Sequence, residues 1–298
     1  MPGLLERPIS YRHVVFPGAP EPAREAFNFT PVPIVLSPSA TELGEDEQDL
    51  VRWIFSEAKL RCVDYRPETI KRRIPACLRA LRLERVSQIR PAIHRKPELL
   101  DIAISSLLIG VTSFFRDPSV FETLAALLSP LAARVPAPKI WCAACSDGAE
   151  LYSVGMLLAE IGVVQRATLL GTDYRADAIA LARRGLYDAN SIKTVPARYL
   201  ARYLRAEQGD WRIHPYLRSI THWRVSDVTS ECEPGEWDVI FCRNLAIYLQ
   251  PMAAGRLWSR LERALKPGGF LVLGKAERPL GINGLRAIAP CIYRRVGK

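Results

Sequence analysis

A chain of 298 residues is long enough for two domains of ordinary size, and its hydrophobic fraction of 49% and charged fraction of 24% are typical of a globular protein. No apolar run reaches the roughly 18 residues that a membrane-spanning helix needs, and charges and prolines interrupt every apolar stretch of the first forty residues, unlike a signal peptide. We therefore expect a cytoplasmic protein without membrane insertion. The net charge of +10 favours an acidic partner, although a solvated basic surface has the same composition.

The seven cysteines are scattered along the chain and, without an export signal, predict reduced thiols rather than a disulfide framework. Cys142 and Cys145 form a CxxC pair, a spacing that also occurs in redox motifs. A zinc site is not expected, because the sequence has no second CxxC and its four histidines show no paired ligand spacing.

Residues 1–41 are rich in proline and show no steady hydrophobic period. Because proline fixes φ and lacks an amide hydrogen, this segment is expected to form an extended arm rather than a packed domain.

Residues 42–115 are expected to form a small helical domain. Thr41 is a suitable N-cap for an amphipathic helix in which acidic residues precede an apolar face. Helical patterns continue over residues 70–81 and 98–108. Pro75 falls inside the basic segment KRRIPACLRALR and is expected to kink or restart its helix.

Strands and helices alternate over residues 116–298. The expected strands are KIWCAA, ATLLGTD, WDVIFC and FLVLG, with helical patterns between them and a turn at KPGG. Residues 204–225 lack a helical period and are expected to form a small β insertion. Such alternation predicts an α/β fold with a doubly wound, mostly parallel sheet.

Ligands of a doubly wound sheet bind beyond the carboxyl ends of its strands. The segment CAACSDGAEL ends the first strand and opens a helix, so small side chains and free helix amides permit a close approach by a ligand, as an ordinary strand-to-helix turn also would. Asp173 ends the second strand, where an acid suits ribose hydroxyls or caps the next helix. Asp227 is a candidate acceptor for an adenine amino group. Together these features favour a nucleoside-containing ligand.

Five motifs follow one another between Val111 and Glu277: VTSFFRD, AACSDGAELYS, GTDYRADAIALARRGLY, FCRNLAIYL and LKPGGFLVLGKAE. In this order and spacing they resemble the chemotaxis receptor methyltransferase family of the CheR type, from about residue 42 to the C-terminus. The resemblance implies a Rossmann-like class I methyltransferase domain with an antiparallel last strand. It also implies S-adenosylmethionine as cofactor, S-adenosylhomocysteine as product, and methyl esterification of glutamates on chemoreceptors.

The resemblance further implies roles for the residues that match the family motifs. Arg116 and Tyr248 are the candidate catalytic residues, although without the resemblance an ion pair of Arg116 with Asp117 and a packed core ring for Tyr248 would be the favoured interpretations. The residues expected to contact the cofactor are Thr112, Arg116, Ala143, Glu150, Asp173, Asp227, Val228, Arg243 and Asn244.

A carboxylate acceptor is already ionised at neutral pH, so its methylation needs no general base. Catalysis then depends on holding the carboxylate in line with the sulfonium, which the guanidinium of Arg116 and the hydroxyl of Tyr248 are suited to do.

Several positions depart from the family pattern and leave the acceptor open. The departures are Gly110 for an asparagine, Ala149 and Leu151 for a glutamate and a proline around Glu150, LGKAE for GHSE, and Pro75 and Cys77 within the arginine-rich helix. The alternatives are a methyltransferase with a different protein or small-molecule acceptor, and a cofactor-binding module without turnover.

Four arginines spread over a broad face of the segment around Pro75. These are Arg72, Arg73, Arg79 and Arg82. The face is expected to meet an acidic helical region of chemoreceptors or of a related signalling protein, although a solvated face fits equally. Nucleic acid is not an expected partner, because no stacking aromatic residues are interleaved with the arginines.

Overall fold

The computed structural model describes residues 43–108 and 112–297. The predicted arm, residues 1–41, lies outside the described residues, as does Gly110. The prediction of Thr41 as an N-cap is wrong, because the first helix begins at Glu45 and Gly44 is its N-cap residue. All seven cysteines are free, as predicted. None of the described helices is both long and apolar enough to cross a membrane.

The first part of the described chain is helical. Its helices are α1 (Glu45–Glu57), α2 (Pro67–Lys71), α3 (Ile74–Leu81), α4 (Ile89–Arg95) and α5 (Leu99–Leu107), with 3-10 turns η2 (Cys62–Asp64) and η3 (Val86–Gln88). Pro75 occupies the first turn of α3, where its missing amide hydrogen costs no helical hydrogen bond. The helix therefore restarts at this proline, one of the two predicted outcomes.

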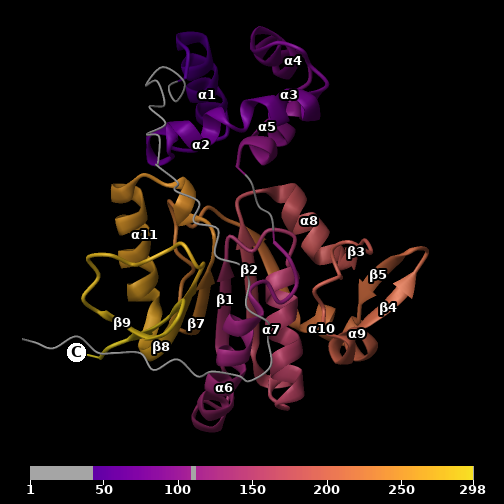
Figure 1. Cartoon of the computed structure of the whole chain (residues 1–298), viewed down its shortest axis with the longest axis vertical. Helices are drawn as coiled ribbons and strands as arrows, with labels where there is room; N and C mark the ends of the chain where they lie inside the picture. The colour runs from indigo at the N-terminus through magenta and orange to yellow at the C-terminus, as the bar shows by residue number, and fades with distance from the viewer. Residues whose placement is uncertain (1–42, 109–111, 298) are drawn as a thin grey trace, which may run out of the picture. The chain divides into compact units, whose positions relative to one another are not determined.

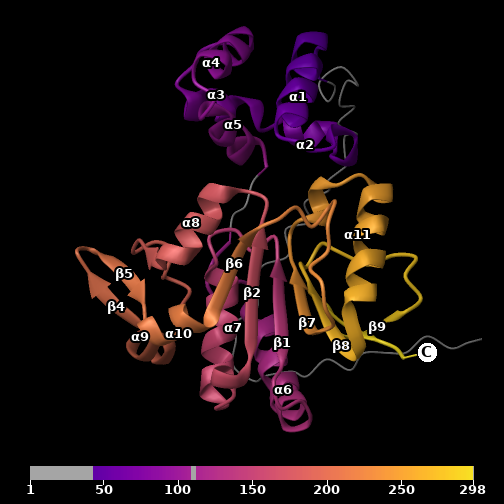
Figure 2. The same ribbon diagram turned by 180° about the vertical axis from the view of Figure 1, so that it is seen from behind.

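A seven-stranded sheet forms the centre of the second part (Figures 1 and 2). Its order is β6 (Thr221–Val225), β2 (Thr168–Asp173), β1 (Lys139–Ala143), β7 (Trp237–Cys242), β8 (Leu265–Leu273), β10 (Ile292–Arg295) and β9 (Leu285–Ala289). The first five strands are parallel, whereas β10 pairs antiparallel with β8 and β9 pairs antiparallel with β10. This confirms the predicted α/β fold with a mostly parallel sheet.

Successive residues of the central strands face two different cores, because side chains alternate along a strand. Ile140 and Cys142 pack with apolar residues of α6 (Pro118–Arg134), α7 (Ala149–Glu160) and α8 (Ala176–Arg184). Trp141 and Ala143 pack with α11 (Pro251–Ala264) and with the apolar residues of the helical segment. Figures 1 and 2 show α7 and α11 on opposite faces of the sheet. Burial on both faces explains why the strands are continuous apolar runs.

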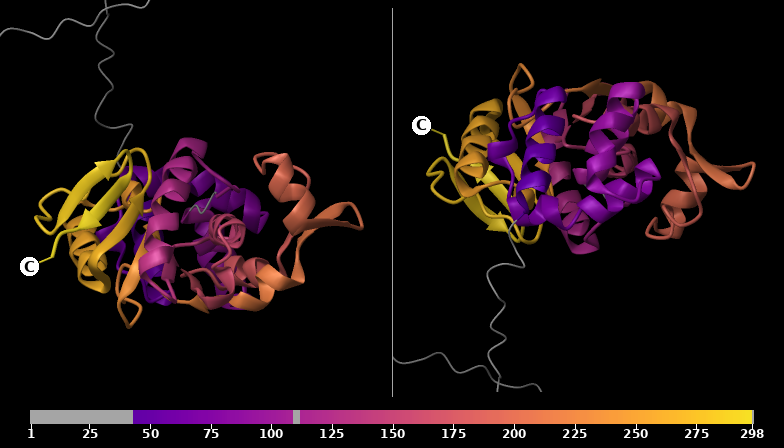
Figure 3. Two further views of the ribbon diagram at one scale, coloured as in Figure 1. Left: turned by 90° about the horizontal axis from the view of Figure 1, so that it is seen from below. Right: turned by 90° about the horizontal axis from the view of Figure 1, so that it is seen from above.

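A second, smaller sheet has the order β3 (Leu186–Tyr187), β5 (Asp210–Ile213), β4 (Leu204–Glu207), with α9 (Ala197–Tyr203) and α10 (Pro215–Ile220) beside it. It lies at the opposite end of the molecule from β9 and β10 (Figure 3). Within residues 204–225, β4 and β5 belong to this sheet, whereas β6 pairs with β2 and extends the main one. The KPGG segment, predicted as a turn, lies within β8, whose register against β7 shifts between Trp237 and Val239.

Candidate active site

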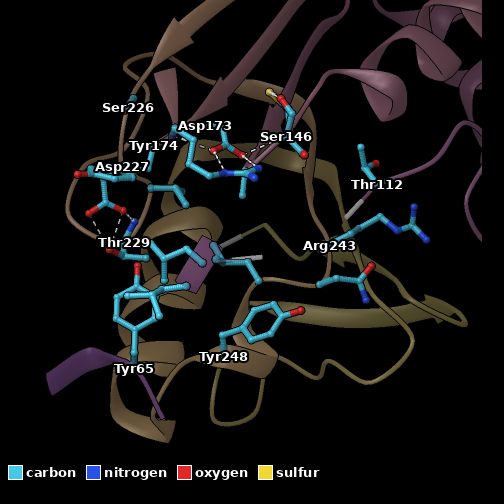
Figure 4. A pocket seen from close by; sticks show the side chains of 18 of the residues that line it. Tyr65, Thr112, Ser146, Asp173, Tyr174, Ser226, Asp227, Thr229, Arg243 and Tyr248 are labelled. Atoms are coloured by element: carbon cyan, nitrogen blue, oxygen red, sulfur yellow. Dashed lines mark hydrogen bonds and ion pairs between the residues drawn. The ribbon is translucent and has the colours of Figure 1, made fainter. Parts of the chain in front are cut away.

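A cavity of about 260 Å³ lies beyond the carboxyl ends of the central strands (Figure 4). Nine of the ten predicted site residues line it: Thr112, Arg116, Glu150, Asp173, Asp227, Val228, Arg243, Asn244 and Tyr248. Residues of the helical segment also line it, namely Tyr65, Thr69, Ile70, Leu107 and Leu108. The cavity thus combines segments that lie far apart in the sequence.

Ala143, the tenth predicted residue, is not among the residues that line the cavity. Its side chain is fully buried in the core on the α11 face of the sheet. The next three residues, Ala144 to Ser146, line the cavity instead. The small residue Gly148 serves packing rather than ligand approach, because a Cβ atom there would lie 2.5 Å from the ring of Trp223.

Left-handed backbone conformations cluster in the loops that form the cavity. Five non-glycine residues of these loops have positive φ: Phe115 (49°), Asp117 (61°), Ala144 (56°), Ser146 (54°) and Asn244 (62°). Such conformations are costly for residues with a Cβ atom and persist only where surrounding contacts enforce them. The loops are therefore held in conformations that a free loop would avoid.

The Asp173 carboxylate lies at the end of β2 and is nearly buried, with 7% of its side chain exposed. Its Oδ2 accepts a hydrogen bond of 2.8 Å from the amide of Ser146. The neighbouring Arg175 contributes both its amide and its guanidinium to the same carboxylate. Arg175 is the N-cap residue of α8, so the bond from its amide ties the Asp173 carboxylate to the start of that helix.

Asp227 stabilises its own turn. Its Oδ1 accepts hydrogen bonds from the amide and the hydroxyl of Thr229, at 2.9 and 2.7 Å. The ring of Tyr65 is buried nearby and its hydroxyl faces this turn (Figure 4). Burial, and then the negative charge of Asp227, raise the pKa of Tyr65 well above its usual range. Tyr65 therefore enters this part of the cavity as a neutral hydrogen-bonding group.

Arg243 connects three segments of the site. Its guanidinium donates hydrogen bonds of 2.7 Å to Glu150 and to Asp117, and one of 2.9 Å to the carbonyl of Arg116. Lys275 pairs with the second carboxylate oxygen of Asp117 at 2.8 Å. Burial alone would raise the pKa of Asp117, but the hydrogen bond from Lys275 and the charges of Arg243 and Lys275 together lower it.

A buried carboxylate fixes the loop between β7 and α11. Glu277 accepts hydrogen bonds from the amides of Asn244 (2.8 Å), Ala246 (2.7 Å) and Gly274 (2.7 Å). The 3-10 turn η5 (Ala246–Tyr248) follows and places Tyr248 at the cavity. Glu277 thereby sets the position of both Asn244 and Tyr248.

The lining residues fit S-adenosylmethionine. The side-chain oxygen of Asn244 is buried and has no hydrogen-bond partner among the described residues, so it offers an acceptor to an ammonium group. The Asp173 carboxylate suits a ribose diol. Ile70, Val228 and Leu245 supply an apolar surface for a base.

Tyr65 and Arg175 are among the lining residues that were not predicted from the sequence. Tyr65 reaches the cavity from the helical segment, and no local pattern around it indicates a ligand site. Arg175 lies two residues after Asp173, so the sequence itself places it close to that carboxylate. Its contact with the carboxylate depends on a side-chain conformation that the sequence does not indicate.

The family model for the CheR methyltransferase SAM-binding domain matches residues 110–288 of this chain. A chemotaxis protein methyltransferase of Vibrio parahaemolyticus is 26% identical over 258 residues, which covers 83% of this chain and 94% of that protein. A putative methyltransferase, Cher3, of Pseudomonas putida is 29% identical over 236 residues, covering 76% of this chain and 86% of that protein.

An uncharacterized 104.1 kDa protein of Rhodobacter capsulatus is 28% identical over 237 residues. The match covers 76% of this chain but only 25% of that much longer protein.

Proposed function

The chain belongs to the CheR methyltransferase family and is an S-adenosylmethionine-dependent methyltransferase, and we propose that it forms methyl esters on glutamate side chains of chemoreceptors. Relatives from two Vibrio species that bear the name chemotaxis protein methyltransferase align with 83% of the chain, which supports this proposal.

One observation carries the choice of a carboxylate acceptor. Arg116 and Tyr248 line the same cavity as Asp173 and Asn244, and there is no histidine among the described residues that line it. An ionised carboxylate needs no base to become a nucleophile, whereas an alcohol or a protonated amine does. A site that pairs an arginine and a tyrosine without a histidine therefore suits a glutamate.

Bound S-adenosylmethionine supplies an electrophilic methyl group on a sulfonium. In the proposed reaction the guanidinium of Arg116 binds the acceptor carboxylate through its planar donors. The hydroxyl of Tyr248 donates one hydrogen bond and holds the attacking oxygen in line. Both contacts must remain modest, because strong pairing would lower the nucleophilicity of the carboxylate.

The helical segment supplies a surface for an acidic partner. Arg72, Arg79 and Arg82 are exposed. Arg73, in contrast, is half-buried and donates a hydrogen bond of 3.1 Å to the carbonyl of Ser106. Three of the four arginines are therefore available to an acidic helix of a receptor, and the fourth holds α3 to α5.

The same proposal assigns separate roles to two regions of the chain. Residues 42–115 act as the helical domain that recognises the acceptor, and residues 116–298 act as the methyltransferase domain, both in the cytoplasm.

The test is transfer of labelled methyl groups to the cytoplasmic fragment of a chemoreceptor. We expect a label that dilute base releases, as an ester requires, and that Arg116→Ala or Tyr248→Phe strongly reduces. Asp173→Ala should weaken cofactor binding by more than Tyr248→Phe does. A base-stable label would indicate another acceptor group, and tight cofactor binding without transfer to any receptor would favour a binding module.

A further inference from the structure

The Asp173 carboxylate has all its acceptor positions occupied by the protein itself. Its Oδ1 accepts from the amide and the Nε of Arg175, both at 3.0 Å. Its Oδ2 accepts from the amide of Ser146 at 2.8 Å and from a terminal guanidinium nitrogen of Arg175 at 3.3 Å. A carboxylate has about four lone-pair positions, so a ribose that approaches this group finds no free acceptor.

The four donors are of two kinds. The amides of Ser146 and Arg175 belong to the backbone of the loop after β1 and of the start of α8, and they keep the carboxylate oriented. The other two donors belong to the Arg175 side chain, which also lines the cavity. Removal of that side chain frees one position on each carboxylate oxygen, which matches the two hydroxyls of a ribose.

We infer that the Arg175 side chain is a displaceable placeholder for the ribose hydroxyls of the cofactor: it occupies Asp173 in the free protein and exchanges with the diol on binding. This inference rests on the proposed role of Asp173 as the ribose-binding acid. Arg175 is then a residue that lowers cofactor affinity and relaxes selection for an intact diol, without taking part in methyl transfer.

Once displaced, the guanidinium can turn toward a second carboxylate within its own helix. Asp177 lies in the first turn of α8 and is exposed. The exchange therefore moves a cation from one carboxylate toward another and leaves no buried charge alone.

The first experiment is calorimetric titration with S-adenosylhomocysteine, which has no sulfonium charge. Arg175→Met keeps the length of the side chain and removes its donors, and it should bind about tenfold more tightly than the wild type. Arg175→Lys keeps the charge but loses the planar guanidinium, and its affinity should lie between those of the wild type and Arg175→Met. Arg184→Met removes an exposed arginine of the same helix and should bind as the wild type does. Weaker binding by Arg175→Met would overturn the inference.

The second experiment compares S-adenosylhomocysteine with its 2′-deoxy analogue. In the wild type, the guanidinium can retain the position that the missing hydroxyl leaves free, so the loss of affinity should be small. In Arg175→Met that position stays empty, and the loss should be several-fold larger. Equal losses in the two proteins would overturn the exchange.

Asp173→Asn separates this inference from its premise. Unchanged affinity in this variant would show that Asp173 does not bind the ribose. A large loss, together with equal effects of the 2′-deoxy substitution in wild type and Arg175→Met, would reject the exchange alone. Neither outcome depends on which acceptor is methylated.

Discussion

The amide nitrogen of Arg66 donates a hydrogen bond of 2.9 Å to the backbone carbonyl of Tyr248. The guanidinium Nε of the same arginine donates one of 2.8 Å to the carbonyl of Leu249, and Tyr65 pairs with Leu249 in an isolated antiparallel bridge. A short piece of β structure therefore joins the helical segment to the candidate catalytic tyrosine.

Arg66→Ala should reduce both stability and methyl transfer. The carbonyl of the buried Leu249 would lose its charged donor, which costs about 1–3 kcal/mol of unfolding free energy. The transfer rate at saturating cofactor should fall more than cofactor affinity does, because Leu249, the residue that follows Tyr248, loses the side-chain donor that holds its carbonyl. Urea denaturation and methyl-transfer kinetics measure the two effects. Arg66→Lys should retain part of the stability and part of the transfer rate. Arg72→Ala, at an exposed arginine, should change neither stability nor cofactor affinity. Equal losses in all three variants would contradict this role of Arg66.

Glu277→Gln should loosen the loop that carries Asn244. The amide nitrogen of a glutamine would face at least one of the backbone N–H groups that the carboxylate now accepts. We expect a loss of about 2–3 kcal/mol in unfolding free energy, with weaker cofactor binding in the folded variant. Chemical denaturation and titration test this, with the exposed Glu236→Gln as the control. A folded variant with wild-type affinity would show that the loop does not need the carboxylate.

The ion pairs of Asp117 should make the unfolding free energy depend on pH in the acid range. The pKa of Asp117 is lowered in the folded protein, so the carboxylate contributes stability that is present above the ordinary aspartate pKa of about 3.9. That contribution is lost as the pH falls through the lowered folded pKa. Asp117→Asn should therefore be less stable than the wild type at pH 7, by about 2 kcal/mol, and the difference should shrink toward acid pH.

Urea denaturation at a series of pH values measures this convergence. Lys275→Ala is the companion variant: its side chain is 64% exposed, so it should cost less than about 1 kcal/mol. A stability difference for Asp117→Asn that does not change with pH would contradict the argument.

Gly148→Ala should destabilise the protein more than Gly209→Ala. Both glycines have a left-handed backbone, with φ of 88° and 90°, so both substitutions carry similar backbone strain. At Gly148 the new Cβ would also meet the Trp223 ring at 2.5 Å, whereas no atom lies within 4 Å at Gly209. The difference between the two variants, expected to be about 1–3 kcal/mol in thermal or urea unfolding, isolates the overpacking at Trp223. Equal effects would mean that the tryptophan ring moves at little cost.

The strands that were predicted from the sequence are those whose residues are buried on both faces. KIWCAA and WDVIFC appear as β1 and β7 because continuous apolar runs leave few other arrangements. The edge strand β9 was not predicted, because three of its five residues are exposed and its sequence lacks a strong pattern. Its pairing depends on β10, which no local signal reveals.

In the candidate site too, some residues could be predicted from local sequence patterns and others depend on packing between distant segments. Nine of the predicted residues line one cavity, and Asp173, Arg243 and Asn244 do so because the ends of β2 and β7 meet at one edge of the sheet. The prediction that Ala143 contacts the cofactor is wrong by one position. Side chains alternate along β1, so Ala143 points into the core and the next residue lines the cavity. The contribution of Tyr65 was beyond prediction, because it depends on packing between distant segments.

The bridge between Tyr65 and Leu249 also sets an order of events in synthesis. Arg66 and Leu249 are 183 residues apart in the chain, and the closing of such a loop is entropically costly and slow. The ribosome must synthesise the strands that precede Leu249 before Tyr65 and Arg66 can pair with that residue. The cofactor cavity of the nascent chain can therefore close only after the loop that carries Tyr248 and Leu249 has been synthesised.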